Sequence, residues 1–275
     1  MRYSYILIMV AGVLLLPSCK KQHTEPPQPP IPRVKQFLLK DITIPNLPSP
    51  YYHFEYSPDS LITKADFSSG FTIYDVLYNG NRITEMRNNI SVNHDTLRYV
   101  YDNSGKPALI KFINSENVVY RHVTFLYDGN QVKEIEWDHK EAGVGFLIDR
   151  TLTFVYYADG NVKTITERRP VIGNLPEYSS VKTFEQYDDK VNVDDFSLVH
   201  DGIHDHLFLL QGFRLQKNNP KKEMLSVNSV NLYTIDYTYT YNNDNTPSIK
   251  RGDFLYLSGQ SAGQRFQTSS FYSYY

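Results

Sequence analysis

The chain has 275 residues, with 28 Lys and Arg against 30 Asp and Glu, so its formal charge is −2 at pH 7. This balance argues against nucleic acid as a partner, because a phosphate-binding surface needs an excess or a stripe of basic residues. The nearest basic group, Lys217 with Lys221 and Lys222, flanks Asn and Pro residues and is typical of a solvated turn. One cysteine excludes an intramolecular disulfide, and 23 tyrosines with 15 phenylalanines favour pleated sheets.

Residues 1–18 have the pattern of a secretion signal. Arg2 supplies a positive charge, residues 6–16 form an apolar run that is too short for a comfortable membrane span, and Leu16-Pro17-Ser18 precede Cys19. Leu-x-Ser-Cys resembles the lipobox of bacterial lipoproteins, in which the cysteine sulfur is lipidated and the peptide is cut just before it. The resemblance implies that Cys19 begins the mature protein and is held to the membrane by lipid. An ordinary signal peptide that merely ends near Cys19 is the alternative.

Residues 19–34 are expected to form a lipidated cysteine and a tether. The segment from Lys20 to Arg33 contains five prolines and almost no apolar side chains, so it favours an extended polyproline II conformation and cannot form a core. We expect it to hold the following domain at the outer membrane. Two lysines come first and Glu25 stands alone, which leaves open whether the domain lies on the periplasmic face or on the cell surface.

Residues 35–275 show the pattern of a single all-β domain built from a repeat. Its unit is an alternating apolar strand that ends in tyrosine, a polar turn such as Asp-Gly-Asn, and a second strand; the tyrosines fall at 56, 78, 101, 127 and 156. Asp-Gly or Asn-Gly between alternating strands indicates a hairpin, because both residues accept a positive φ. We predict an antiparallel meander of β-hairpins, either a curved sheet or a soluble or porin-like barrel. The three-residue step from Val132 to Ile135 breaks the alternation and predicts a bulge.

The C-terminal half contains a longer pattern that resembles a known family. The tyrosine units are similar to the Tyr-Asp repeats of bacterial wall-associated proteins, while residues 182–192, 216–221 and 239–247 resemble the Bacteroidota lipoprotein family called domain of unknown function 4595. That resemblance implies a porin-like fold, with a curved or closed antiparallel sheet, and brings no assigned activity, catalytic residue or ligand. The irregular stretch 190–206 is expected to form a large loop or a short helical excursion. Residues 192–196 depart from the Asn-Pro-Phe segment of the family, so the loop there is expected to differ from that of the family.

Two motifs are candidates for chemistry. His200, His204 and His206 are the densest group of candidate metal ligands, but zinc needs three or four converging ligands and neither a thiol nor a fourth ligand can be named. A solvated loop is the favoured interpretation, with a metal site as the alternative. Residues 259–263 match Gly-x-Ser-x-Gly, yet no His or Asp follows them as a hydrolase would require, so we expect a glycine-rich turn between the last two strands.

Acidic side chains alternate along one predicted strand, where Glu134, Glu136 and Asp138 surround Trp137. Carboxylates beside an aromatic ring occur in glycosidases, but alternating acids usually mark the wet face of a strand. The positions expected to face outward are polar, whereas a membrane-spanning barrel needs an outer apolar band; they are Asp95, Arg98, His122, Thr124, Thr151 and Thr153.

The function expected from these observations is that of a non-enzymatic cell-envelope lipoprotein without a cofactor. Lipid on Cys19 would attach it to the membrane, and its hairpin sheet would bind a glycan, a peptide or an envelope protein. Two alternatives stay open at this point. One is a metal-dependent or carbohydrate-active protein that uses residues 190–206, and the other is a structural protein of the envelope.

Overall fold

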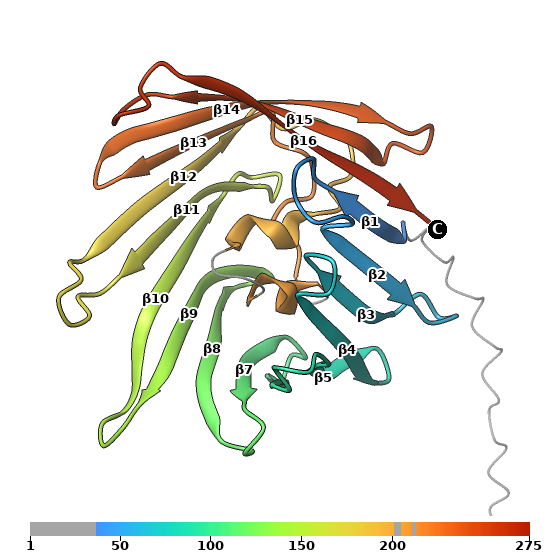
Figure 1. Ribbon diagram of the computed structural model, residues 1–275, viewed down its shortest axis with the longest axis vertical. Helices are drawn as coiled ribbons and strands as arrows, with labels where there is room; N and C mark the ends of the chain where they lie inside the picture. The colour runs from blue at the N-terminus through green and yellow to red at the C-terminus, as the bar shows by residue number, and fades with distance from the viewer. Residues whose placement is uncertain (1–36, 201–204, 211–212) are drawn as a thin grey trace, which may run out of the picture. The chain divides into compact units, whose positions relative to one another are not determined.

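Sixteen antiparallel strands close into one barrel (Figure 1). The computed structural model describes residues 37–200, 205–210 and 213–275, so the signal segment, Cys19 and the tether lie outside the described residues. Each strand pairs with the next in the chain, and β1 pairs with β16 to close the barrel. The predicted all-β meander is confirmed, and of the two expected forms it is the barrel.

The strands are β1 (Leu39–Thr43), β2 (Tyr52–Tyr56), β3 (Ile62–Phe67), β4 (Thr72–Asn79), β5 (Arg82–Asn88), β6 (Thr96–Tyr101), β7 (Pro107–Ile113), β8 (Val119–Asp128), β9 (Gln131–Glu141), β10 (Gly145–Tyr156), β11 (Val162–Arg169), β12 (Tyr178–Glu185), β13 (Lys222–Val227), β14 (Val230–Tyr241), β15 (Pro247–Tyr256) and β16 (Arg265–Tyr274). Two short 3₁₀ helices, η1 (Asp195–Val199) and η2 (Asp205–Leu209), lie between β12 and β13. The expected helical excursion in this stretch is therefore present.

The hairpin of β8 and β9 shows how the repeat folds. Gly129 in its turn has φ 54°, the positive value that the Asp-Gly pattern predicts. The register shifts beside the tyrosine, where Tyr127 pairs with Val132, and this confirms the predicted bulge. The same shift occurs beside the tyrosines of five other hairpins, at positions 56, 78, 101, 156 and 241.

The repeated tyrosines join neighbouring hairpins through their hydroxyl groups. Tyr127 donates to the carbonyl oxygen of Pro107 at 2.7 Å, and Pro107 lies opposite Tyr101, the tyrosine of the preceding hairpin. Eight such bonds of 2.6–2.9 Å run around one end of the barrel, and we call their donors the tyrosine ring: Tyr56, Tyr78, Tyr101, Tyr127, Tyr156, Tyr187, Tyr239 and Tyr274. The ring explains why tyrosine, rather than phenylalanine, ends the units at positions 56, 78, 101, 127 and 156.

The inner face of the barrel is largely apolar, and η1 and η2 lie inside the barrel (Figure 1). Phe208 of η2 is fully buried, and its ring lies 6.0 Å from that of Phe125 and 6.1 Å from that of Trp137. Its carbonyl oxygen accepts a 2.7 Å hydrogen bond from the Tyr99 hydroxyl. The segment is therefore part of the core.

The segments that carry the family resemblance meet where this inserted segment enters and leaves the lumen. The Asp188 carboxylate accepts a hydrogen bond from the backbone N–H of Asn219 at 3.1 Å and another from the Tyr241 hydroxyl. The side-chain oxygen of Asn161 accepts the backbone N–H groups of Lys217 and Asn218 at 2.9 and 3.0 Å. The predicted solvated turn at 217–222 is thus wrong for its asparagines, which anchor the returning chain, although the Lys217 side chain is exposed.

Candidate functional site

A cavity of about 670 Å³ opens at the end of the barrel opposite the tyrosine ring. It lies where β8, β10 and β12 begin and where β9 and β11 end, beside the loop of residues 170–177. We call it the mouth cavity; its lining residues are Arg121, Trp137, Asp149, Arg150, Arg169, Pro170, Ile172, Leu175, Pro176, Glu177, Tyr178 and Asn228. A volume of this size is typical of small-molecule sites.

Strand alternation brings the principal side chains to the inner face. Trp137 pairs with Val123 on one side and with Arg150 on the other, so all three point into the barrel. Arg169 and Tyr178 pair in the same way across β11 and β12, and the Arg169 guanidinium lies 5.5 Å from the centre of the Tyr178 ring. The cavity is thus built from side chains of five successive strands.

A carboxylate fixes two of the arginines. The Arg150 side chain is only 8% exposed; its Nε lies 3.1 Å from Oε1 of Glu167, and its guanidinium lies 4.6 Å from the centre of the Trp137 ring. Arg169 donates from Nε to the same Oε1 at 2.6 Å. Glu167 therefore holds both guanidinium groups in defined positions.

The third arginine lies on the other side of Arg150. Nη2 of Arg121 is 3.9 Å from the Asp149 carboxylate, which is also 3.2 Å from Nδ1 of His139. Asp149 occupies a register shift in β10, between Ile148 and Arg150. Such bulges redirect a side chain, which here lies at the cavity.

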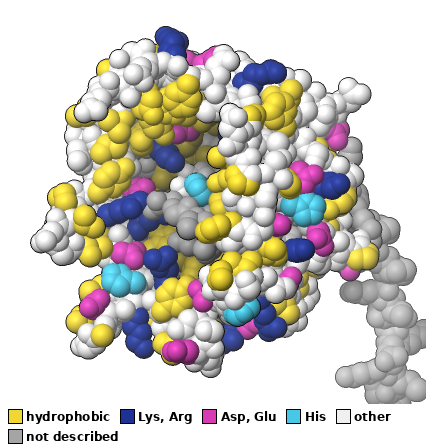
Figure 2. Space-filling view, viewed as in Figure 1, with side chains coloured by type: hydrophobic (Ala, Val, Ile, Leu, Met, Phe, Trp, Pro, Cys, Tyr) yellow, Lys and Arg dark blue, Asp and Glu magenta, His cyan; other side chains and the backbone are white. Residues whose placement is uncertain are grey.

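The rim of the mouth cavity is apolar on the side of the loop that joins β11 to β12. In the loop of residues 170–177, Ile172 and Leu175 form an isolated bridge, and Leu175 is 68% exposed. The tip of the β9–β10 hairpin also exposes Phe146, Leu147 and Ile148, but these side chains do not line the cavity, and the Phe146 ring stacks on the outward-facing His122 at 3.9 Å. Figure 2 shows hydrophobic and basic side chains beside one another around the hollowed part of this face.

The histidines singled out in the sequence are only partly brought together. His204 lies outside the described residues, while Nδ1 of His200 and Nδ1 of His206 are 2.8 Å apart. His206 is fully buried, and its Nε2 lies 2.6 Å from the Tyr52 hydroxyl. The interpretation of this stretch as a solvated loop is therefore wrong for His206, which packs in the lumen beside Phe67. Within the described ranges, no group of three His, Cys, Asp or Glu side chains could hold a metal.

The acidic strand and the glycine motif take the positions expected of them. Glu134, Glu136 and Asp138 face outward from β9, while Trp137 points inward, so the carboxylates and the indole lie on opposite faces. Burial, followed by repulsion from the two neighbouring carboxylates, raises the pKa of Glu136. Residues 259–263 form the turn between β15 and β16, as predicted.

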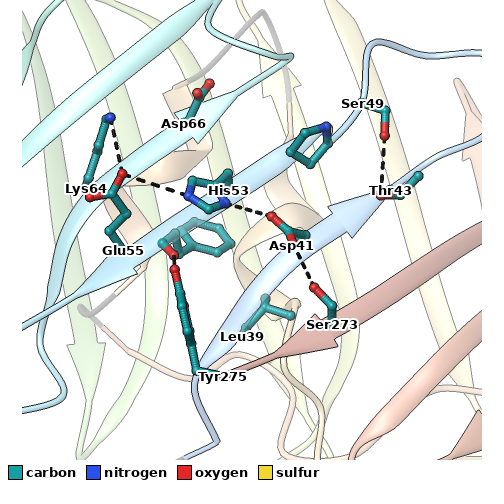
Figure 3. A network of polar contacts seen from close by, with 12 residues as sticks. Leu39, Asp41, Thr43, Ser49, His53, Glu55, Lys64, Asp66, Ser273 and Tyr275 are labelled. Carbon is teal, nitrogen blue, oxygen red and sulfur yellow. Dashed lines mark hydrogen bonds and ion pairs between the residues drawn. The ribbon is translucent and has the colours of Figure 1, made fainter.

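A polar network covers the seam where the barrel closes (Figure 3). Asp41 on β1 accepts a 2.8 Å hydrogen bond from Ser273 on β16 and lies 2.7 Å from Nδ1 of His53 on β2. Asp41 lies between the serine and the histidine, whereas a catalytic triad needs the histidine in the middle. The three residues therefore join strands across the seam, and Glu55 extends the network to Lys64 at 3.3 Å.

Sequence reasoning named Trp137 only as the neighbour of three acidic side chains, and it missed the arginines of the mouth cavity. Arg121, Arg150 and Arg169 are separated by about twenty to thirty residues and form no motif. Strand alternation alone could have placed Arg150 on the same face as Leu152, and this was the only available signal.

Comparison with known proteins shows the fold. No protein-family model matches the chain, and no curated protein matches it. A porin-like protein from Bacteroides vulgatus ATCC 8482 is similar in structure, with a TM-score of 0.59 and 18% sequence identity over 86% of this chain and 99% of that one. A porin-like protein from Bacteroides uniformis ATCC 8492 has a TM-score of 0.58 and 14% identity over 82% of this chain and 89% of that one.

These similarities define the class of fold as a porin-like barrel. Across the described ranges, none of the helices is long and apolar enough to cross a membrane.

Proposed function

We propose that this chain is a lipid-anchored protein of the bacterial cell envelope that binds a ligand in its mouth cavity without transforming it. The observation that carries this proposal is the cavity itself, with its fixed arginines, aromatic side chains and apolar rim. Concave sites that combine apolar walls with a few fixed polar groups are the usual form of ligand sites.

Several features support binding over catalysis or transport. Two carboxylates at the cavity contact basic side chains: Asp149 faces Arg121 and His139, and Glu167, behind the lining, faces two arginines. The buried core of η1 and η2 occupies the lumen, which argues against an open pore. Small glycans and short peptides both match a site of this size, because arginine, carboxylate and tyrosine groups can pair with their hydroxyl or amide groups.

Membrane attachment is proposed from the sequence. The lipobox pattern at Cys19, the proline-rich tether and the resemblance to the domain of unknown function 4595 family all support a lipoprotein at the outer membrane. The polarity of the barrel agrees with this: Thr124, Thr151 and Thr153 face outward, and the apolar side chains face inward. A barrel whose outer face contacts lipid has the reverse pattern.

The binding proposal is tested by a glycan and peptide array probed with the mature chain. The variant Leu175→Asp places a charge on the apolar rim of the cavity, and Leu126→Asp, on the outer face of β8, is the matched control. We expect Leu175→Asp to lose the ligands that the wild type and Leu126→Asp retain. Identical binding by all three proteins would show that the mouth cavity is not the site.

The anchor is tested by Cys19→Ala in cells fed a labelled fatty acid. We expect the wild type to carry the label and to sediment with membranes, whereas the variant does neither. Protease treatment of intact cells then distinguishes the two faces of the outer membrane. Cleavage before lysis indicates the surface, and cleavage only after lysis indicates the periplasm. An unlabelled wild type would contradict the lipid anchor.

A further inference from the structure

We infer that one end of the barrel docks on the surface of a lipid bilayer through apolar side chains at its loops. It is the end at which the mouth cavity opens, and its loops are the eight that join each odd-numbered strand to the next strand; we call them the mouth loops. This inference goes beyond ligand binding, and it relies on the proposed lipid anchor only for the reach of the tether.

Every mouth loop presents a large apolar side chain to solvent, either in the loop or directly beside it. We call these eight side chains the apolar tips, and their exposed fractions run from 39% to 87%. From β1 to β8 they are Leu47, Phe71, Val92 and Val118. From β9 to β16 they are Val144, Leu175, Val230 and Leu257. Because the barrel is closed, the tips encircle one end of it; the loops after β9, β11 and β13 lie at the left of Figure 1.

The turns at the tyrosine-ring end have the opposite character. Their described residues include no large apolar side chain of comparable exposure, and the short hairpin turns there consist largely of Asp, Asn, Gly and Ser. Single exposed apolar side chains are normal on a protein surface. A set that occupies every loop at one end, and none of the described turns at the other, marks the mouth end as an interaction surface.

The mouth loops carry little charge. They contain no lysine or arginine, and their acidic side chains are those of Asp95, Glu116 and Glu177. Asp95 accepts a 2.6 Å hydrogen bond from the Tyr120 hydroxyl. The other polar residues of the loops are mainly Asn and Ser. Docking therefore depends on the apolar tips, and not on the attraction of basic side chains to anionic lipid.

The arrangement of the apolar tips fits a bilayer better than a protein surface. Sixteen strands spaced about 4.8 Å apart and tilted by about 40° give a ring roughly 30 Å across. Each tip stands on a separate hairpin around this ring, whereas the core of a protein interface is one contiguous apolar patch. A bilayer accepts separated side chains individually, because each enters the boundary between headgroups and acyl chains.

The outer wall behind the tips is polar, which limits the contact to the surface of the bilayer. Thr151 of β10 pairs with Glu136 of β9 and with Arg168 of β11, and all three side chains point outward. Burying such groups in hydrocarbon is costly. The apolar tips can therefore enter the membrane interface, but the strands cannot follow them.

The tether is long enough for both attachments to share one bilayer. The chain enters β1 at the tyrosine-ring end, where the carbonyl oxygen of Leu39 accepts a hydrogen bond from Tyr56. Residues 19–36 would span about 55 Å if extended at about 3.1 Å per residue. The longest strands have 12 residues and span about 40 Å. A lipid on Cys19 can thus lie in the same membrane that the mouth loops touch.

Site-specific labels test the contact directly, because Cys19 is the only cysteine in the chain. The mature chain from residue 19, carrying Cys19→Ser, receives one new cysteine for an environment-sensitive dye. Val92→Cys places the dye at a mouth loop, Leu126→Cys on the outer face of β8, and Asn81→Cys in a turn of the opposite end. With vesicles of phosphatidylcholine, we expect the dye at position 92 to brighten and shift to the blue, and the dyes at 126 and 81 to stay unchanged. Equal responses at the three positions would overturn the inference.

Matched triple variants test whether the apolar tips supply the binding energy. The mouth triple replaces three tips that do not line the mouth cavity: Val92→Asp, Val144→Asp and Val230→Asp. The control triple replaces three exposed apolar residues of the outer face: Val100→Asp, Leu126→Asp and Val155→Asp. In vesicle flotation, we expect the mouth triple to lose about 100-fold in partition, at about fivefold per partly buried aliphatic side chain, and the control triple to partition as the wild type does.

Low and high salt should give the same partition, because no basic side chain of the loops takes part. Circular dichroism checks the folding of both triples, and the dye-labelled chains carry the test if either triple fails to fold. The inference is overturned if the wild type does not bind vesicles, if both triples bind as the wild type does, or if binding requires anionic lipid and disappears in high salt.

The oligomeric state separates a bilayer from a second copy of the chain. A wild-type dimer that the mouth triple dissociates, with no binding to vesicles, would show that the mouth loops meet another copy and would overturn the inference. The proposed function is judged separately, by the array and by the labelled fatty acid, because neither depends on Val92, Val144 or Val230.

Discussion

Removing one hydroxyl from the tyrosine ring tests whether the ring stabilises the barrel. In Tyr127→Phe, the carbonyl oxygen of Pro107 loses a 2.7 Å hydrogen bond while the aromatic ring keeps its packing. A net loss of about 1 to 2 kcal/mol is expected, because a typical intramolecular hydrogen bond contributes about 1 kcal/mol and a partly buried oxygen loses this donor. In a domain of this size, that corresponds to a fall in Tm of roughly 2–8 °C, from about 2–4 °C per kcal/mol.

Equilibrium unfolding in urea, followed by circular dichroism and by the fluorescence of Trp137, measures this loss. Tyr256→Phe is the matched control: the Tyr256 ring packs against Phe254 and Phe266, and its hydroxyl makes no hydrogen bond within the described residues, so its loss should leave the free energy of unfolding unchanged. Tyr78→Phe and Tyr156→Phe lie in separate hairpins, so their effects should add in the double variant. Equal stability of Tyr127→Phe and the wild type would refute the role assigned to the ring.

Three further predictions concern pH and packing. Burial raises the pKa of the ring tyrosines above their ordinary value of 10.0. The stability that they contribute is therefore present below pH 10 and is lost as the pH rises further. The absorbance of tyrosinate and the circular dichroism of the strands should change together, and a separate tyrosinate transition near pH 10 would contradict this prediction. Burial also raises the pKa of Asp195 from 3.8 to about 6, although two backbone N–H groups oppose the shift. The protonated carboxyl thus favours the folded protein below pH 4, and this stabilisation is lost as the pH rises through 6. Asp195→Asn should therefore stabilise the protein by about 1–2 kcal/mol more at pH 7.5 than at pH 4. Equal effects of the substitution at the two pH values, measured by urea unfolding, would exclude the pKa shift. Finally, a Cβ added at Gly252 would lie 2.8 Å from side-chain atoms of both Ile235 and Thr268. Gly252→Ala should therefore lower the free energy of unfolding by about 1–3 kcal/mol in the same urea assay. An unchanged urea midpoint would show that β14, β15 and β16 adjust freely to the added methyl group.

Local features of the fold could be predicted from the sequence because they depend on neighbouring residues. A strand that alternates apolar and polar side chains and ends in Tyr-x-Gly-Asn can form its hairpin with little help from the rest of the chain. The bulge beside Tyr127 follows from a three-residue step printed in the sequence. The turn at 259–263 needed only its glycines. These predictions are confirmed for that reason.

The candidate site could not be predicted, because it depends on side chains that only the closed barrel brings together. Arg121, Arg150 and Arg169 come from three strands, and their common direction depends on the register of each pair. The burial of His206 is similar: its residue type and polar neighbours suggest a solvated loop, yet the hydroxyl of Tyr52, 154 residues away, contacts it in the lumen.

The sequence by itself determined the unit of construction, a tyrosine-ended hairpin repeated along the chain. Only the tertiary structure decided that β1 pairs with β16, that the stretch after β12 turns into the lumen, and that three arginines surround one cavity. The physical reason is the range of the interactions. Turns and alternation act over a few residues, whereas closure, filling of the lumen and the grouping of the arginines at the mouth cavity depend on pairings between residues that lie far apart in the chain.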